Sequence, residues 1–149
     1  MTKPETPKTT ATKIVDLFSD FAVDDALSQE GVWVPYAGGV EFLIARAGNK
    51  TYRKVAQNLY DKNRRMLEGK KDAAAEKLIE ITVEAMARVI LLNWRGDVQF
   101  QGEPLPYNLE NARKILRMER LRDFIDGVAK DETAYAAVRE EEEEANLTK

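Results

Sequence analysis

The residue types that most often carry chemistry in proteins are sparse in this sequence. Its 149 residues include no histidine and no cysteine. Histidine is the commonest general base and transition-metal ligand, and cysteine supplies thiolate nucleophiles and zinc ligands. We therefore expect no catalytic residues, no metal site and no cofactor, and we predict that the protein is not an enzyme.

The remaining candidates for acid–base chemistry are carboxylates at helical spacing. Glu80 and Glu84 are four residues apart, which places them on one face of a helix. No other convergent group accompanies them, so we interpret them as a solvated face that interrupts an apolar helix. The RGD tripeptide at residues 95–97 is short enough to occur by chance and predicts a turn.

Basic side chains gather in one part of the chain and could bind a partner. Residues 50–71 contain eight basic and two acidic residues, although the net charge of the whole chain is −3. Arg53, Lys54, Arg64 and Arg65 are candidate contacts within this segment, which also carries two tyrosines. Such a segment can follow a nucleic-acid backbone. We favour a solvated helix or a protein partner, because the net charge is acidic and no known nucleic-acid-binding motif is present.

Acidic side chains gather at the C-terminal end. Residues 123–149 contain nine acidic and three basic residues. The simplest interpretation is a solvated tail, but its glutamates could also meet the basic segment of a second copy. Complementary ends of this kind favour a head-to-tail homo-oligomer, either a ring or an open spiral. The candidate self-association residues are Glu140, Glu141, Glu142, Glu143 and Glu144.

Aromatic residues cluster near a glycine pair that predicts a β-hairpin around residues 32–46. The segments VWVPY and VEFLIAR are rich in β-branched and aromatic residues, and they flank Gly38 and Gly39. Pro35 cannot donate a ladder hydrogen bond, so its strand should lie at a sheet edge. Three aromatic residues of the hairpin are candidate partner contacts, with burial in the core as the alternative: Trp33, Tyr36 and Phe42.

The rest of the chain predicts helices. Apolar residues recur at helical spacing in residues 14–21, from residue 49 to about 68 and from about 72 to 94. Asn49 and Asn108 are candidate N-caps, Gly69 is a stop signal, and further helices are expected after residues 108 and 131. The predicted fold class is mainly α with a small β-hairpin (α+β), with several helices packed around one core.

The domain organisation follows from composition. Residues 1–12 are polar and contain two prolines, which predicts disorder. Residues 13–138 are expected to form a single helical domain, and residues 139–149 an acidic tail. The longest apolar stretch is interrupted by Glu80, Glu84 and Arg88, so we expect no membrane association.

The order of several segments resembles the tail assembly chaperones of long-tailed bacteriophages. The resemblance spans about residues 14–130 and rests on FAVDDALSQEGVWVPYAGGVEFLIARAGNKTYRK, LLNWRGDVQFQGEPLPYNLENARKIL and LRDFIDGVAK. Proteins of that family coat the tape measure protein, keep it soluble and help to recruit tail tube protein during tail morphogenesis. The resemblance implies these two partners, a mainly helical fold with a small β element, and action in the host bacterial cytoplasm without incorporation into the mature virion.

Two other functions remain open from the sequence. A structural component of the virion, in the tail or connector, would also use protein contacts without catalysis. A small nucleic-acid-binding regulator would use the basic segment at residues 50–71. We take the non-enzymatic assembly chaperone as the leading hypothesis, with the hairpin aromatics and the basic segment as its contact residues.

Overall fold

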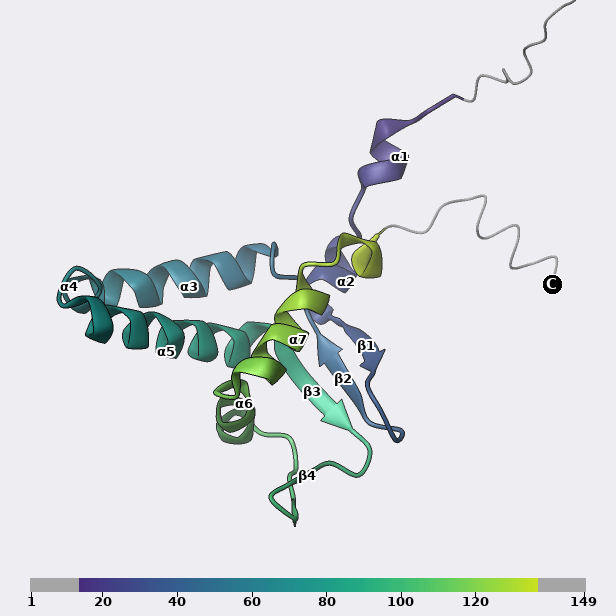
Figure 1. Cartoon of the computed structure of the whole chain (residues 1–149). Coiled ribbons are helices and arrows are strands. Elements are labelled where there is room, and N and C mark those ends of the chain that lie inside the picture. Colours follow the sequence, from purple (N-terminus) through teal and green to yellow (C-terminus); the bar gives the residue numbers. More distant parts are fainter. Residues whose placement is uncertain (1–13, 137–149) are drawn as a thin grey trace, which may run out of the picture. The chain divides into compact units, whose positions relative to one another are not determined.

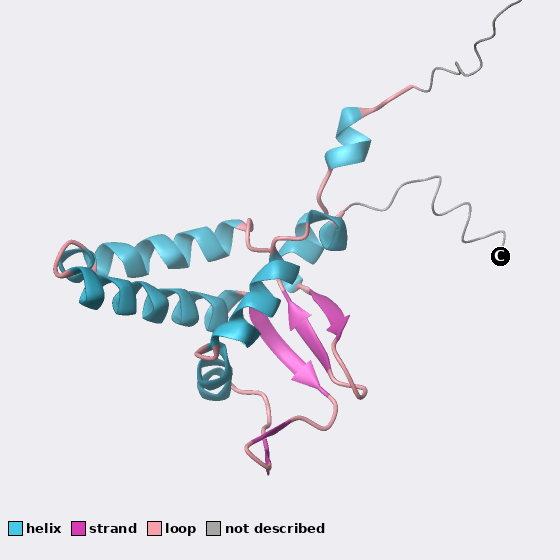
Figure 2. Ribbon diagram, viewed as in Figure 1, coloured by secondary structure: helices cyan, strands magenta, loops and turns pink. Residues whose placement is uncertain are grey.

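A computed structural model describes residues 14–136 of the chain. These residues divide into a larger compact unit, residues 23–135, and a smaller one to which residues 14–22 and 136 belong. Helices dominate, and the strands form two small antiparallel sheets, as Figure 2 shows. The predicted mixed α+β class is confirmed.

The described part of the smaller unit contains one short helix. The helix α1, Leu17–Phe21, begins after Asp16, whose carboxylate accepts a hydrogen bond from the Phe18 N–H. The apolar residues predicted to form its stripe are strongly exposed: Ile14 by 98%, Leu17 by 66%, Phe18 by 81% and Phe21 by 78%. The predicted amphipathic segment is therefore helical over one turn, from Leu17 to Phe21.

A pair of antiparallel helices forms the most extended part of the larger unit. The helix α3 (Lys50–Lys62) packs beside α5 (Lys71–Val89), and the short α4 (Arg64–Leu67) joins them at the end away from the sheet (Figure 1). The predicted N-cap is confirmed, since Asn49 Oδ1 accepts the Tyr52 N–H. The single helix expected up to Gly69 is wrong in one detail: it breaks at Asn63, whose side-chain amide donates to the Leu59 carbonyl.

A three-stranded sheet follows the order β1–β2–β3, with β1 at Val32–Pro35, β2 at Glu41–Ile44 and β3 at Leu91–Arg95. The predicted hairpin is present as β1 and β2, and Pro35 lies on the edge strand. The third strand corrects the helix predicted to continue to residue 94. The residues after Ile90 form a strand instead of continuing the helix, and they pair with β2. Just before this strand, the Ile90 carbonyl accepts a hydrogen bond from the Ala45 N–H.

One face of this sheet packs on helices, and strand alternation decides which side chains reach it. Phe42, Ile44 and Trp94 point into the core, which α5 and two C-terminal helices complete. These helices are α6 (Leu109–Leu116), capped by Asn108, and α7 (Glu119–Ala129). The core is lined from α5, α6 and α7, and from Ile90 just after α5, by Val83, Met86, Ala87, Ile90, Ala112, Ile115, Leu116, Ile125 and Ala129.

Two turns approach closely at the end of the sheet. Gly96 has a φ of +102°, and a Cβ placed there would lie 2.8 Å from the Gly39 carbonyl oxygen in the hairpin turn. This glycine follows Arg95 and begins the turn that the RGD tripeptide predicts. Beyond it, residues 99–104 form a small hairpin of β4 (Gln99–Phe100) and β5 (Glu103–Pro104).

The two ends of the larger unit are joined by hydrogen bonds. The Asp24 N–H, just before α2 (Asp25–Glu30), donates to the Tyr135 carbonyl at 2.8 Å. Tyr135 is fully buried, and its hydroxyl donates to the Ile44 carbonyl at 2.9 Å. Of the helix predicted after Asp131, the structure shows the 3₁₀ turn η2 (Glu132–Tyr135), which ends before residue 136; the residues after 136 lie outside the described range.

Candidate functional site: protein-binding surfaces

The hairpin aromatics do not form one surface. Phe42 is only 5% exposed and lies in the core, because it occupies an inward position of β2. Tyr36 is 63% exposed at the hairpin turn, where its ring packs edge-on against Phe42 and Phe124. Of the candidate contacts at the hairpin, Tyr36 is therefore the most accessible, and Phe42 acts by supporting it.

Trp33 lies on the opposite face of the sheet from Phe42. It pairs in register with Leu43, so both project away from the core. The Arg95 guanidinium stacks 3.9 Å from the centre of the Trp33 ring and also pairs with Glu41 at 2.7 Å. Because the guanidinium stacks on the ring in a cation–π contact, Trp33 is half-buried and its exposed face is covered by a positive charge.

The four candidate basic residues are distributed along the helical pair. Arg53 and Lys54 lie on α3 near the sheet, whereas Arg64 and Arg65 lie on α4 at the far end. From Arg53 to its last residue, Lys62, α3 runs about 14 Å along its axis, and Arg64 follows beyond the break at Asn63. All four are exposed, and Arg64 pairs with Asp61 at 2.8 Å. They line a long surface rather than one site.

Large apolar side chains accompany these cations. We call α3, α4 and residues 71–80 of α5 the arm. The arm contains no buried residue, and several large apolar side chains stand 45–50% exposed on it: Tyr60, Met66, Leu78 and Ile79. Large uncovered apolar residues interspersed with charges are typical of protein-binding surfaces.

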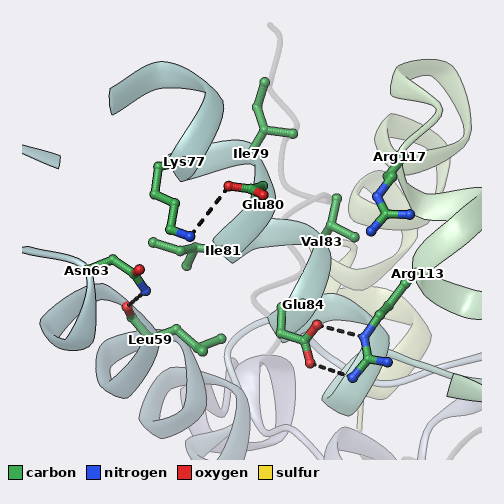
Figure 3. A pocket seen from close by; sticks show the side chains of 10 residues that line it. All are labelled: Leu59, Asn63, Lys77, Ile79, Glu80, Ile81, Val83, Glu84, Arg113 and Arg117. Carbon is green, nitrogen blue, oxygen red and sulfur yellow. Dashed lines mark hydrogen bonds and ion pairs between the residues drawn. The ribbon is translucent and has the colours of Figure 1, made fainter. Parts of the chain in front are cut away.

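A hollow of about 350 Å³ lies where the arm joins the core (Figure 3). Its walls come from α3, α5 and α6, so we call it the α3–α5–α6 hollow. Apolar side chains from α3 and α5 line it together with polar and charged groups: Leu59, Asn63, Lys77, Ile79, Glu80, Ile81, Val83, Glu84, Arg113 and Arg117. Lys77 pairs with Glu80 at 3.5 Å along one side.

Glu84 binds two arginines at this hollow. Arg113 donates two hydrogen bonds to its carboxylate, at 2.7 and 2.9 Å, and Arg88 donates from one turn further along α5. The fork from Arg113, helped by Arg88, holds the pKa of the Glu84 carboxyl below its usual value. Glu84 therefore links α5 to α6, which corrects the expectation that it belongs to a solvated face.

A second hollow lies between the hairpin turn and the start of α7. We call it the Tyr36 groove. It encloses about 500 Å³ and is lined by Tyr36, Met118, Arg120, Leu121 and Phe124. Met118 is 43% exposed, which adds a flexible apolar wall beside the two aromatic rings.

The Tyr36 groove adjoins a third charged segment, residues 113–122, which lies between the basic segment at residues 50–71 and the acidic segment at residues 123–149. Residues 113–122 contain five basic residues and one acidic residue, Glu119. Arg120 lines the Tyr36 groove, whereas Arg117 lines the α3–α5–α6 hollow, and neither side chain has a hydrogen-bond or ion-pair partner among residues 14–136. The signal in the sequence was RKILRMERLR, which holds these charges across the break between α6 and α7.

Other sequence-based expectations concern sites that the structure does not describe or does not form. The five candidate self-association glutamates, Glu140 to Glu144, lie outside residues 14–136. Within the described range, no group of three or more acidic side chains is arranged to hold a metal ion. Nor does any helix in that range have the length and apolarity needed to cross a membrane.

These features define a small α+β protein with two apolar, cation-rimmed surfaces. A family model described as YdaY prophage protein matches residues 47–149, which is more than half of the chain. The chain belongs to this family, and its phage origin, expected from the resemblance, is confirmed. No curated protein and no solved structure shows a significant match.

Proposed function

We propose that this prophage protein is a tail assembly chaperone that acts by binding, without catalysis. Its client would be the tape measure protein, and it would help to recruit tail tube protein during tail morphogenesis. The proposal is supported by the phage family, by the order of segments that resembles such chaperones, and by the surfaces of the larger unit. It would act in the host bacterial cytoplasm and be absent from the mature virion.

The observation that carries the proposal is the uncovered arm. Four large apolar side chains remain about half exposed there, next to Arg53, Lys54 and Arg65, for which no ion pair is formed within residues 14–136. A long helical client must be held in solution along its length and later released. A surface with dispersed apolar contacts and cations suits weak binding, since charges raise the association rate while apolar contacts supply affinity.

The test is co-expression with a segment of the tape measure protein encoded in the same prophage. We expect the chain to increase the soluble fraction of that segment and to co-elute with it from a size-exclusion column. Replacing Leu78 and Ile79 by serine should reduce both effects. The matched control is Leu109→Ser, a similarly apolar and exposed residue on α6, outside the arm.

Two outcomes would contradict the proposal. If the tape measure segment neither gains solubility nor forms a complex with the wild-type chain, the chaperone function is wrong. If mass spectrometry finds the chain at stoichiometric levels in purified particles, it is a structural component instead. A salt-sensitive mobility shift with DNA, lost in Arg53→Glu and Lys54→Glu, would favour the nucleic-acid-binding regulator.

A further inference from the structure

We infer that a pocket between α2 and the start of α3 binds a phosphate group. We call it the α2–α3 pocket. It encloses about 150 Å³ and is lined from α2, from the connection between β2 and α3, and from the first turn of α3. The pocket lies within the larger unit, and none of the exposed apolar side chains of the arm lines it.

A buried hydroxyl in this pocket has no hydrogen-bond partner in the described part of the chain. Ser28 lines the pocket and is 3% exposed. Its N–H donates to the Asp24 carbonyl and its carbonyl accepts the Arg46 N–H, so the hydroxyl is the polar group left over. Asn49, the other buried polar residue among those described, has its side-chain oxygen and nitrogen both bonded. Because buried polar groups are rarely left unpaired, the Ser28 hydroxyl indicates a ligand in the pocket.

The start of α3 adds donors of the kind that bind anions. This helix has 13 residues, and Asn49 satisfies the Tyr52 N–H through its side chain and the Arg53 N–H through its carbonyl. The N–H groups of Lys50 and Thr51 have no acceptor among residues 14–136. Free N–H groups and the helix dipole favour an anion at such an end. The side chains of Lys50 and Arg53 line the same pocket and form no ion pair within that range.

Arg46 supplies a guanidinium that is already held in place. Its Nε and Nη2 donate to the Glu132 carboxylate at 3.0 and 3.1 Å, which leaves Nη1 without an acceptor in the described residues. A Cβ placed on Gly48 would lie 2.7 Å from this Nη1. The lack of a side chain at Gly48 therefore makes room for the guanidinium. Because Glu132 fixes the group beforehand, little conformational entropy is lost when it binds an anion.

Charge, size and the placement of the donors select phosphate among anions. Three basic side chains line the pocket with one acidic side chain, Asp25, and the balance stays positive when Glu132 behind Arg46 is counted. About 150 Å³ holds roughly five water molecules, which is enough for one phosphate group and too little for a nucleotide. Donors from three separate segments suit the three free oxygens of a phosphate monoester better than the two of a flat carboxylate. The ligand is therefore inorganic phosphate or the terminal phosphate of a small molecule.

The experiment titrates the full-length chain with inorganic phosphate while its backbone amide resonances are recorded by NMR. Sodium chloride of equal ionic strength is the control for general screening. We expect saturable shifts that are largest for the Lys50 and Thr51 amides, because these two N–H groups gain an acceptor. The same amides should respond to adenosine monophosphate if the source is a monoester, and to inorganic phosphate alone if it is the free ion.

Single substitutions test the separate contributions. Ser28→Ala and Lys50→Gln should each weaken phosphate binding by about tenfold or more, since each removes a hydrogen bond to a charged group. Ser28→Ala should not lower the unfolding temperature without phosphate, because the hydroxyl has no partner to lose. Asp25→Asn should strengthen binding, because it removes a carboxylate that repels the anion. Lys62→Gln, at the far end of the same helix, is the control matched to Lys50→Gln and should leave binding unchanged.

Three results would overturn the inference. The first is amide shifts in chloride as large as those in phosphate, and the second is an affinity for phosphate that neither Ser28→Ala nor Lys50→Gln changes. The third is a response to a single-stranded DNA oligonucleotide with none to inorganic phosphate or adenosine monophosphate, which would assign the basic residues to a nucleic-acid backbone. None of these results bears on the tape measure assay, which compares variants at Leu78 and Ile79 on the arm.

Discussion

The two halves of α5 experience different environments within one helix. From Lys71 to Glu80 no residue is buried, whereas from residue 81 to Val89 six residues are buried. The first half belongs to the arm and the second half to the core beneath the sheet. The first half is rich in strong helix formers, whereas the second half contains the β-branched residues Ile81, Thr82 and Val83, so packing against the core rather than helix propensity supports the second half.

This contrast indicates a division of work. The core is stabilised by side chains from β2, β3, α5, α6 and α7, and it fixes the position of the arm. The arm contributes little burial and keeps its apolar and basic side chains accessible. Substitutions should therefore divide into those that unfold the protein and those that change only what it binds.

The largest expected effect comes from truncating the core. Leu116, on α6, is fully buried, and Leu116→Ala should lower the free energy of unfolding by about 2–5 kcal/mol because it leaves a cavity. Leu78→Ala, on the arm, should change it by no more than about 0.5 kcal/mol. Urea denaturation of both variants measures the difference. Similar losses for the two substitutions would contradict the division.

The next effect concerns Tyr135, which joins the two ends of the larger unit. Tyr135→Phe leaves the buried Ile44 carbonyl without its hydroxyl donor, which should lower the unfolding free energy by about 1–3 kcal/mol. Urea denaturation at neutral pH measures this loss. Tyr52→Phe, also a tyrosine of raised pKa, is the comparison variant without that buried hydrogen bond.

Tyr135 should also make stability sensitive to alkaline pH. Burial, with a smaller contribution from Asp131, raises the pKa of the Tyr135 hydroxyl from 10.0 to about 12. The folded state therefore holds this proton more tightly than the unfolded state does. Its contribution is complete below pH 10.0 and is lost as the pH rises toward about 12. Tyr135→Phe should lose that part of the alkaline slope; an unchanged slope would exclude this assignment.

A smaller effect is expected where the arm meets the core. Glu84→Gln weakens the fork from Arg113, and because Glu84 is half-buried the cost should be about 1 kcal/mol. Since its pKa is lowered in the folded state, the Glu84 contribution is present above pH 4.5 and is lost as the pH falls through the lowered value. Glu80→Gln is the matched control: Glu80 pairs with Lys77 at 3.5 Å and is well exposed, so this substitution should lower the free energy of unfolding at neutral pH by less than Glu84→Gln does.

The smallest effect is expected at the end of the arm. Arg64 pairs with Asp61 at 2.8 Å, a distance close to those of the Glu84–Arg113 fork, but both side chains are well exposed. Exposed pairs gain little because water solvates both charges. Arg64→Ala should leave the urea midpoint unchanged at low and at high salt. A clear loss of stability would show that the arm is more tightly organised than its exposure indicates.

Local signals in the sequence predicted most element types. Asn49 and Asn108 cap helices as expected, and the Gly38–Gly39 pair turns the hairpin. These features depend on residues close in the chain, so short-range patterns contain them. The fully apolar run after Val89 was assigned to a helix, because a buried strand and a buried helix have the same composition over so few residues.

The binding surfaces were harder to predict, because each combines distant segments. Tyr36 and Phe124 lie 88 positions apart in the sequence, and nothing near either residue identifies the other. Phe42 and Trp33 look equivalent in sequence, yet strand alternation buries the first and places the second under Arg95. Glu84 was interpreted as solvent-facing because its partner Arg113 lies on another helix.

The passage from α5 to β3 has a mechanical consequence. Only Ile90 separates the last helical residue, Val89, from the first strand residue, Leu91, and its carbonyl is held by Ala45 of the neighbouring chain segment. A connection of one residue restricts rotation of α5 relative to β3. A force applied at α4 would therefore be transmitted through α5 to the sheet, because the two elements are joined by a single residue.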